Sequence, residues 1–339
     1  MIHYVEGVPI IPLGDPHLGR SFVNGVPLHR RGDREKMVWE DFEKSLRLAR
    51  EKLVRLHVCM GDLFDRFTVP LEVILRAALA YSAAAASSPE TVFVIIGGNH
   101  DASRDADRTS AFAVFRHLVE RHFNIFVVHE EPFELKIDDS WFAFVPWHPF
   151  KNAREMVEQL LNKDHGYDAV FGHWDIERFP GSEDNLLPVD LLTKCTRRVF
   201  TGHIHQPGVL YDPNHDLEII CTGSMQPYAH GEDVDGKMYV TVSQDELITT
   251  LANDPEAFRN CCVRVDVRPG HEALPEFDCL QLTVREVGQD ITENIEVGFD
   301  AFDMDKLFKE AMAEENVSSS IVQKIRERYD EMRMQGVAQ

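Results

Sequence analysis

Five short motifs of potential metal ligands constrain the fold of this 339-residue chain more than any other feature. They are Asp15-Pro16-His17, Gly61-Asp62-Leu63-Phe64-Asp65, Gly98-Asn99-His100-Asp101, Gly172-His173 and Gly202-His203-Ile204-His205. Apolar runs precede them at Val8–Leu13, Leu56–Met60, Thr91–Ile96, Ala169–Phe171 and Arg198–Phe200. Short β-branched runs of this kind, bounded by glycine, are typical of buried strands. Because neighbouring strands deliver their ends to one edge of a sheet, ligands distant in sequence can converge there.

The residue types in these motifs favour a particular kind of ion. Carboxylate and amide oxygens together with imidazole nitrogens suit Mn²⁺, Fe²⁺ or Zn²⁺ better than Ca²⁺. Taken singly, an aspartate after a glycine is most often a turn residue, and a histidine in that place is usually an exposed loop residue. The combination of five motifs, each after a strand-like run, predicts a metal site.

The segments between the motifs read as helices. Trp39–Leu56 has a helical stripe of apolar residues at Phe42, Leu46, Ala49 and Leu53. Further helices are expected at Val73–Ala86, where an alanine run is stopped by Ser-Ser-Pro, and at Ala111–Glu120. Strands that alternate with helices predict an α/β layered fold.

The order of the motifs resembles that of the calcineurin-like metallophosphoesterases. The segments Asp15–Gly19, Gly61–Asp65 and Gly98–Asp101 resemble the SbcD-type recombination nucleases. The segments Gly172–Asp175, Thr201–His205 and Thr222–Pro227 resemble the recombination endonuclease subunit of tailed phages. The resemblance covers roughly residues 8–245, and Pro16 departs from it, since the family often has threonine or tryptophan between the two ligands.

The resemblance implies a fold, a ligand set and an acid. The fold would be the four-layer metallophosphoesterase sandwich, two mixed β-sheets flanked by helices, with a small α+β cap and C-terminal helices. One metal would be held by Asp15, His17, Asp62 and His205, and the other by Asp62, Asn99, His173 and His203. Two ions roughly 3.5–4 Å apart clamp a phosphate and acidify a water. His100 would stabilise the leaving group or donate a proton to it, and Asp101 would orient the His100 imidazole.

The C-terminal third of the chain has a different character. Residues 246–339 contain ten Lys+Arg and twenty Asp+Glu, and strands are expected at Asn260–Val267 and Leu280–Val287. We expect a nuclease-type domain over 1–245, a cap over 246–300 and a helical segment over 301–339. Apolar stripes at helical spacing occupy the last segment, at Met304, Leu307, Phe308, Ala311 and Met312 and again at Ile321, Ile325, Tyr329 and Met332. These helices either pack on their own domain or, as the resemblance implies, dock an SMC-like ABC ATPase.

Composition limits the alternatives. The formal net charge of −22 is opposite to what an autonomous DNA-binding protein prefers. A basic stretch at His29–Lys36 either lines a DNA path or is a solvated loop. No apolar run approaches the roughly 18 residues of a membrane span. The N-terminus does not resemble a signal peptide, and the six cysteines form no CxxC pair, so reduced thiols and a cytoplasmic location are expected, in the host cell if the chain is phage-encoded.

Three functions remain. The leading one is a two-metal DNA nuclease with 3′-to-5′ exonuclease and single-strand endonuclease activity. Mn²⁺ is the expected ion, and Mg²⁺, Fe²⁺ and Zn²⁺ are the alternatives. The nuclease would be the catalytic subunit of a recombination or repair complex with the ATPase, and the resemblance implies a homodimer formed by the helices after the second and third motifs. A small-molecule phosphodiesterase acting on cyclic nucleotides would share all five motifs. A non-catalytic scaffold of the ATPase complex is the third, and the retention of every ligand position argues against it.

Overall fold

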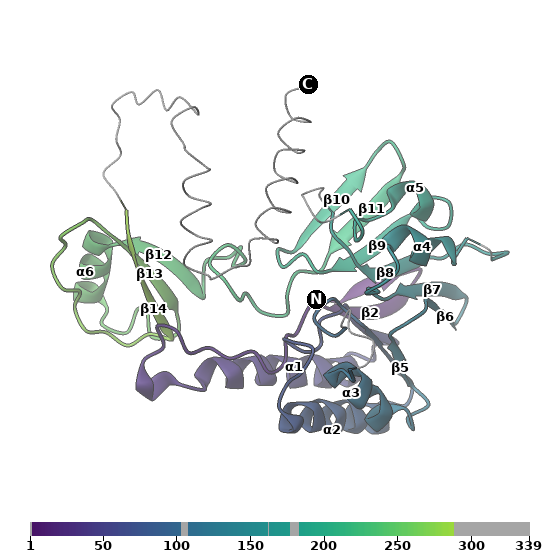
Figure 1. Ribbon diagram of the computed structural model, residues 1–339, viewed down its shortest axis with the longest axis horizontal. Helices are drawn as coiled ribbons and strands as arrows, with labels where there is room; N and C mark the ends of the chain where they lie inside the picture. The colour runs from purple at the N-terminus through teal and green to yellow at the C-terminus, as the bar shows by residue number, and fades with distance from the viewer. Residues whose placement is uncertain (1, 103–107, 162, 177–182, 288–339) are drawn as a thin grey trace, which may run out of the picture. The chain divides into compact units, whose positions relative to one another are not determined.

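The computed structural model describes residues 2–102, 108–161, 163–176 and 183–287 (Figure 1). The expected helical segment 301–339 and the end of the expected cap therefore lie outside the described residues. The order of helices and strands follows the alternation predicted from the sequence, and the described chain contains three β-sheets.

The first sheet has five strands in the order β1-β2-β3-β4-β5. They span His3–Val5, Val8–Leu13, Leu56–Cys59, Val92–Ile96 and Ile125–Val128. Neighbours from β2 to β5 are parallel, so the carboxyl ends of β2, β3 and β4 lie at one edge. Three of the five metal-ligand motifs follow these strands.

The second sheet has six strands in the order β10-β11-β9-β8-β7-β6. In chain order, strands β6 to β11 span Phe133–Ile137, Ser140–Val145, Ala169–His173, Arg198–Gly202, Gly208–Asp212 and Leu217–Cys221. The central pairs β7–β8, β8–β9 and β9–β11 are parallel, and an antiparallel pair closes each side. The remaining two motifs lie at the ends of β8 and β9.

Apolar side chains from the facing sides of the two sheets form one core. It contains Ile10, Val58 and Val94 from the first sheet and Phe144, Phe171 and Phe200 from the second. The outer face of the first sheet is covered by α1 (Asp33–Glu51), α2 (Leu71–Ser87) and α3 (Ala111–Val119). The outer face of the second is covered by α4 (Ala153–Glu158) and α5 (Val189–Leu192). The predicted four layers of an α/β sandwich with two mixed sheets are confirmed.

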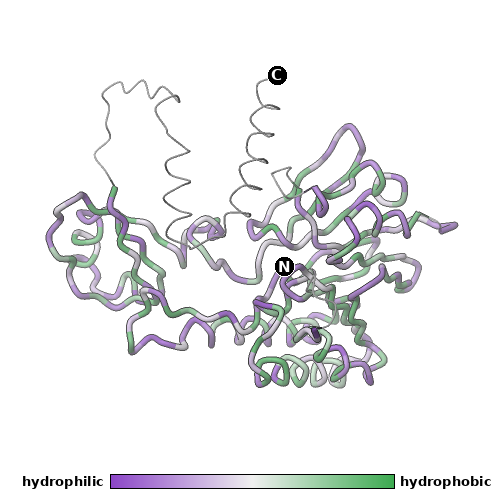
Figure 2. The backbone as a smooth tube through the Cα atoms, viewed as in Figure 1, coloured by the Kyte–Doolittle hydropathy of each residue, from purple (hydrophilic) through white to green (hydrophobic). Residues whose placement is uncertain are grey.

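The predicted helices differ from the observed ones mainly at their ends. Helix α1 begins six residues before Trp39, after a short 3-10 turn at Leu28–Arg30, and buries Phe42, Leu46 and Ala49 as predicted. The prediction for Leu53 is wrong: α1 ends at Glu51, and Leu53 adopts a φ of 52° with 81% of its surface exposed. In Figure 2, α1 alternates between hydrophilic and hydrophobic colours, whereas α2 is mostly hydrophobic.

A third sheet of three parallel strands follows. Its strands are β12 (Tyr239–Ser243), β13 (Cys262–Val267) and β14 (Gln281–Glu286), with α6 (Gln244–Asn253) between the first two. Leu247 of α6 and Val263 and Val265 of β13 belong to a separate small core. Because β12 begins at Tyr239, this sheet starts a few residues before the predicted boundary at 245, and the division into domains stays a prediction.

The basic stretch at His29–Lys36 has a structural role in part. Arg34 is 1% exposed and donates to the side-chain oxygen of Gln226 at 2.8 Å and to the carbonyl of Pro227 at 3.0 Å. Arg30 is ion-paired with Asp33 at 3.2 Å. These two cations are therefore engaged within the protein.

Candidate metal centre

The five motifs meet where the carboxyl ends of five parallel strands approach each other. Asp15 and His17 follow β2, Asp62 follows β3, and Asn99 follows β4. From the second sheet, His173 ends β8, and His203 and His205 follow β9. Asp15, His17, Asp62 and His173 are 0–2% exposed, and the structure brings all seven predicted ligand residues together.

One group of donors is formed by Asp15, His17 and His205, whose ligand atoms lie within 4.8 Å of one another. Nε2 of His17 is 3.1 Å from Nε2 of His205. Nε2 of His205 is also 3.8 Å from a carboxylate oxygen of Asp15. This group brings two imidazole nitrogens and a buried carboxylate to one point.

A second group surrounds the side-chain oxygen of Asn99. Nε2 of His173 and Nδ1 of His203 each lie 3.0 Å from that oxygen and 3.2 Å from each other. Asp62 joins the same group, with Oδ2 at 3.5 Å from Nε2 of His173. Two nitrogens, an amide oxygen and a carboxylate oxygen are again gathered around one point.

Asp62 connects the two groups. Its Oδ2 lies 3.5 Å from His173 on one side and 3.8 Å from Nε2 of His17 on the other. Its Oδ1 accepts a hydrogen bond from the backbone N–H of His100 at 2.9 Å, which fixes the carboxylate. Asp62 occupies the position that a carboxylate shared by two ions requires.

The donor atoms are arranged to bind divalent cations and are not fully satisfied by hydrogen bonds to one another. Oδ1 of Asp15 is buried without a hydrogen-bond partner among the described residues. His17, Asp62 and His203 adopt left-handed backbone conformations, with φ of 45°, 47° and 71°. Non-glycine residues pay for this conformation, and such residues concentrate at functional sites. The centre thus combines backbone strain, converging lone pairs and an unpartnered buried carboxylate oxygen, and these features fit a site that binds divalent cations.

Electrostatics support this interpretation. Burial raises the pKa of Asp15 to about 7. Burial also lowers the pKa of His17 to about 3, which keeps its imidazole neutral as a metal ligand requires. Burial disfavours the charge on His173, but the carboxylates of Asp62 and Asp15 raise its pKa to about 10. The same carboxylates that favour a cation at His173 would favour a divalent ion, whose binding requires the neutral imidazole.

The glycines of the motifs are required by crowding. A methyl group on Gly61, whose φ is 120°, would overlap the ring of His173. A methyl group on Gly98 would overlap the carboxylate of Asp62. The motifs combine ligands with glycine because the five loops approach so closely that a side chain would displace a ligand.

His100 lies at the rim of the centre with 42% of its side chain exposed. Its Nδ1 is 2.6 Å from the carbonyl oxygen of Asp65, and its Nε2 is 4.0 Å from Oδ2 of Asp62. Because a carbonyl oxygen only accepts, Nδ1 must carry a proton, and Nε2 faces the centre. The ring is held where it can act on a substrate bound at Asp62.

Asp101 does not orient His100 as the sequence suggested. Its buried carboxylate accepts backbone N–H groups of Leu63 at 3.1 Å, Phe64 at 3.0 Å and Gly98 at 3.0 Å. It therefore ties the loop after β3 to the loop after β4. The group that orients His100 is the Asp65 carbonyl, while the Asp65 side chain lies 3.5 Å from Arg20.

Two further carboxylates hold ligand histidines and were not predicted. Asp175 lies 3.0 Å from Nε2 of His203, and Glu232 lies 3.0 Å from Nδ1 of His205. The Asp175 carboxylate also accepts a hydrogen bond from the side-chain amide of Asn185 at 3.3 Å, which helps to hold its loop. Its place two residues after His173 was a usable signal, but nothing near Glu232 in the sequence points to the site.

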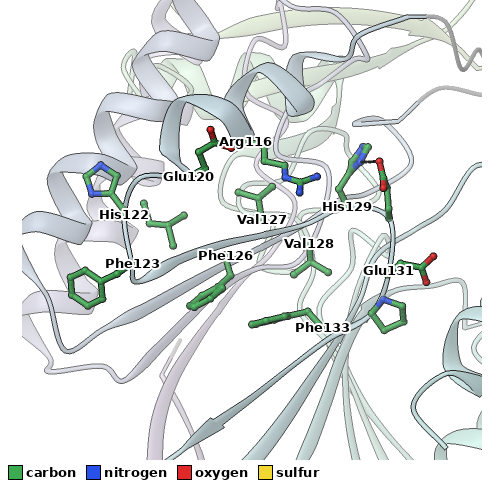
Figure 3. A pocket seen from close by; sticks show the side chains of 13 residues that line it. Arg116, Glu120, His122, Phe123, Phe126, Val127, Val128, His129, Glu131 and Phe133 are labelled. Atoms are coloured by element: carbon green, nitrogen blue, oxygen red, sulfur yellow. Dashed lines mark ion pairs between the residues drawn. The ribbon is translucent and has the colours of Figure 1, made fainter. Parts of the chain in front are cut away.

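A separate hollow of about 580 Å³ lies along the edge strand β5 and the end of α3 (Figure 3). Figure 3 shows Phe126, Val127 and Phe133 on its walls, with Arg116 and Glu120 above them. None of the seven predicted ligands or His100 is among the described residues that line it. The chemistry is therefore placed at the strand ends and not in this hollow.

A four-layer α/β sandwich with this donor set at its strand ends defines a metal-dependent phosphoester hydrolase. Residues 8–207 match the sequence profile of the calcineurin-like phosphoesterases, and the chain belongs to that family. The recognition of the family from the motifs is confirmed, and the protein is an enzyme that hydrolyses phosphoesters at a two-metal site.

Among solved structures, the chain is similar to the crystal structure of a dimetal phosphatase from Danio rerio. The two are 13% identical with a TM-score of 0.42, and the alignment covers 64% of this chain and 87% of the other. Among curated proteins, none matches the sequence significantly. Within the described residues, no helix is both long and apolar enough to cross a membrane.

Proposed function

We propose that the protein is a two-metal DNA nuclease of the SbcD type. Its ligands would be Asp15, His17, Asp62 and His205 for one ion and Asp62, Asn99, His173 and His203 for the other. The observation that carries the proposal is the position of Asp62 between two donor groups, with the half-exposed His100 ring 4.0 Å from the same carboxylate. Mn²⁺ is the ion we expect, since the mixed oxygen and imidazole donors suit it.

When bound, two divalent ions polarise a phosphoryl oxygen and acidify a water. The protein's own residues supply the rest. Asp62 fixes the geometry between the two donor groups, and His100, held by Asp65, stabilises or protonates the leaving oxygen of the sugar. The ring is exposed on one side, so a long polymer can reach it.

We favour DNA over a small molecule as the substrate for two reasons. The residues within the motifs resemble those of the nuclease branch, and the His100 ring is exposed to solvent on one side. Leu18-Gly19 and Leu63-Phe64-Asp65 resemble the nuclease branch of the family. Leu18 and Leu63 are fully buried, and the backbone N–H of Leu18 donates to the carbonyl of Leu63 at 2.9 Å, which joins the first two ligand loops. The resemblance of these segments supports the nuclease, and the cyclic-nucleotide diesterase is the alternative that the activity test separates.

The acidity of the chain is consistent with a partner that holds DNA. Arg20 is a cation near the centre, 33% exposed, 3.5 Å from Asp65 and over the ring of Tyr228 at 4.8 Å. Arg30 and Arg34 of the basic stretch are engaged within the protein. We propose that an SMC-like ABC ATPase supplies much of the DNA grip, bound by the segment 301–339, which lies outside the described residues.

A homodimer is a second proposal on partners. Leu71, Leu75 and Leu79 recur at every fourth residue of α2 and are 61%, 42% and 69% exposed. A leucine stripe of this kind on an exposed helix face marks an interface. Sedimentation velocity would test it: the double substitution Leu75→Glu, Leu79→Glu should give a monomer. Leu53→Glu, at a leucine beyond α1 that is 81% exposed, should leave the dimer intact.

The first test of the activity is Mn²⁺-dependent cleavage of labelled single- and double-stranded DNA, with a cyclic dinucleotide alongside. Degradation of DNA that Asp62→Ala abolishes would establish the nuclease. Turnover of the cyclic dinucleotide alone, repeated in the presence of an ATPase partner, would move the protein to the small-molecule phosphodiesterases.

A further inference from the structure

A second hollow, of about 650 Å³, opens directly beside the candidate metal centre. It shares Asn99, Asp175 and His203 with the centre, and its other lining residues come from the segment after β7 and from the segment after β8. Its volume is in the range of cavities that enclose small organic ligands. Since Asn99 and His203 are candidate ligands, a molecule in this hollow would continue from a phosphate bound at the centre.

Aromatic side chains form a large part of the lining of this hollow. Trp147, His148 and Phe150 line the hollow, and Trp174 lies buried at its base. Trp147 is half-buried, and Phe150 is 63% exposed. Exposed aromatic rings beside a phosphate-binding centre are the groups on which nucleobases stack.

The backbone fixes this wall relative to the centre. The N–H of Trp147 donates to the carbonyl of Gly97 at 2.9 Å, and Gly97 begins the loop that carries Asn99. Nδ1 of His148 accepts the N–H groups of Phe150 at 3.0 Å and Lys151 at 2.9 Å. The proton of the His148 ring therefore sits on Nε2, which is left as a donor. The aromatic wall is preorganised and not a loose loop.

The charges of the hollow exclude a second phosphate. Asp175, Asp184 and Glu155 line it, and Lys151 is ion-paired with Glu131 at 2.5 Å. An anion would meet the carboxylates of Asp175, Asp184 and Glu155 here, whereas a neutral planar ring with polar edges would meet aromatic side chains and the Nε2–H of His148. The ligand that fits is a nucleoside and not a further part of the phosphate backbone.

We infer that this hollow, lined by Trp147, His148 and Phe150, is a subsite for the nucleoside that stays on the phosphate during hydrolysis. The inference deepens the proposed function and rests on it. His100 is not among the residues that line the hollow, so the leaving group would lie on the other side of the centre. The enzyme would then hold the terminal nucleoside of a strand and release it as a 5′-monophosphate.

Two diesters with the same leaving group isolate the subsite: thymidine 5′-(p-nitrophenyl phosphate) and methyl p-nitrophenyl phosphate. In both, water adds to phosphorus and the bond to p-nitrophenolate breaks, so only the group in the hollow differs. With the full-length protein and Mn²⁺, we expect Trp147→Ala to lower the kcat/KM ratio of the thymidine ester to the methyl ester by about tenfold. Trp147→Phe, which keeps a ring, should restore most of the ratio.

The control variant is Phe123→Ala, which removes a 78% exposed ring at the other hollow and should leave the ratio as in the wild type. If Trp147→Ala fails to fold, Phe150→Ala removes an exposed ring of the same wall and carries the test. An unaltered ratio in a folded variant, with both esters hydrolysed, would overturn the subsite and leave the phosphodiesterase activity standing.

Failure of the proposed function gives a different result. If the wild type hydrolyses neither ester, equilibrium dialysis of thymidine 5′-monophosphate against wild type and Trp147→Ala decides the subsite alone. Binding weakened about tenfold by the substitution supports it, and equal binding overturns it.

Discussion

The carbonyl oxygen of Asp65 lies 2.6 Å from Nδ1 of His100 and sets the orientation of that ring. A main-chain atom therefore positions the candidate acid, while the Asp65 carboxylate faces Arg20 and His17. The hydrogen bond puts Nε2 of His100 toward Asp62, 4.0 Å from its Oδ2. The ring needs no rearrangement to meet a substrate at the centre.

His100→Ala should retain both metals and lose most hydrolysis, about 10²–10⁴-fold in kcat, because a leaving-group acid contributes that much. Asp62→Ala should lose both metals, since its carboxylate faces both donor groups. Metal content measured after dialysis, beside kcat for a diester, separates the two effects. His117→Ala, at an exposed histidine of α3, is the matched control. Near wild-type turnover by His100→Ala would show that the leaving-group role is wrong.

Gly98→Ala should abolish tight metal binding, because the added methyl group overlaps the Asp62 carboxylate. We expect calorimetric titration with Mn²⁺ to show the loss of at least one site. Gly208→Ala is the control, since a methyl group there meets open space. Two intact sites in Gly98→Ala would mean that the loop moves freely enough to accommodate a side chain.

Asp175→Asn should weaken metal binding about 10–100-fold, as is typical when the partner of a ligand histidine is removed. Its carboxylate lies 3.0 Å from Nε2 of His203, and Nδ1 of the same ring faces Asn99. The Mn²⁺ concentration that gives half-maximal activity is the measurement. Asp190→Asn, an exposed aspartate of α5, should leave that concentration unchanged, and an equal effect of both substitutions would remove the assigned role.

His57 should make the fold acid-sensitive. Burial lowers its pKa to about 3 in the folded protein from an ordinary value of 6.5, and its Nε2 contacts Ser45 Oγ at 2.7 Å. The unfolded chain therefore takes up a proton below about pH 6.5 while the folded protein does not. This stabilisation is complete above that pH and is lost as the pH falls toward 3.

Between pH 7 and 5, the His57 contribution to the free energy of unfolding should fall by about 2 kcal/mol. His57→Gln cannot ionise, so its stability should decline by that much less over the same interval. Urea denaturation in the presence of a chelator measures both proteins, with His117→Gln as the substitution control. Parallel pH profiles for wild type and His57→Gln would contradict the expectation.

Much of the fold and of the ligand set could be read from local patterns. Strand-like runs before Asp15, Asp62 and Asn99 placed these residues at strand ends, because a buried strand needs a short β-branched stretch and a turn needs glycine. Parallel neighbours then bring the ends to one edge. The helical stripe failed at Leu53 because a pattern of apolar residues does not fix where a helix ends.

The contacts that arrange the site were decided by tertiary structure. Asp101 binds backbone N–H groups of two loops and leaves His100 to Asp65, and Glu232 reaches His205 from a segment without a motif. The sequence by itself determined which residues are candidate ligands and on which strands they lie. Only the tertiary structure decided which carboxylate or carbonyl contacts which imidazole ring. It also decided that Trp147 lines a hollow beside Asn99. These distances depend on how loops that are separate in the sequence pack together.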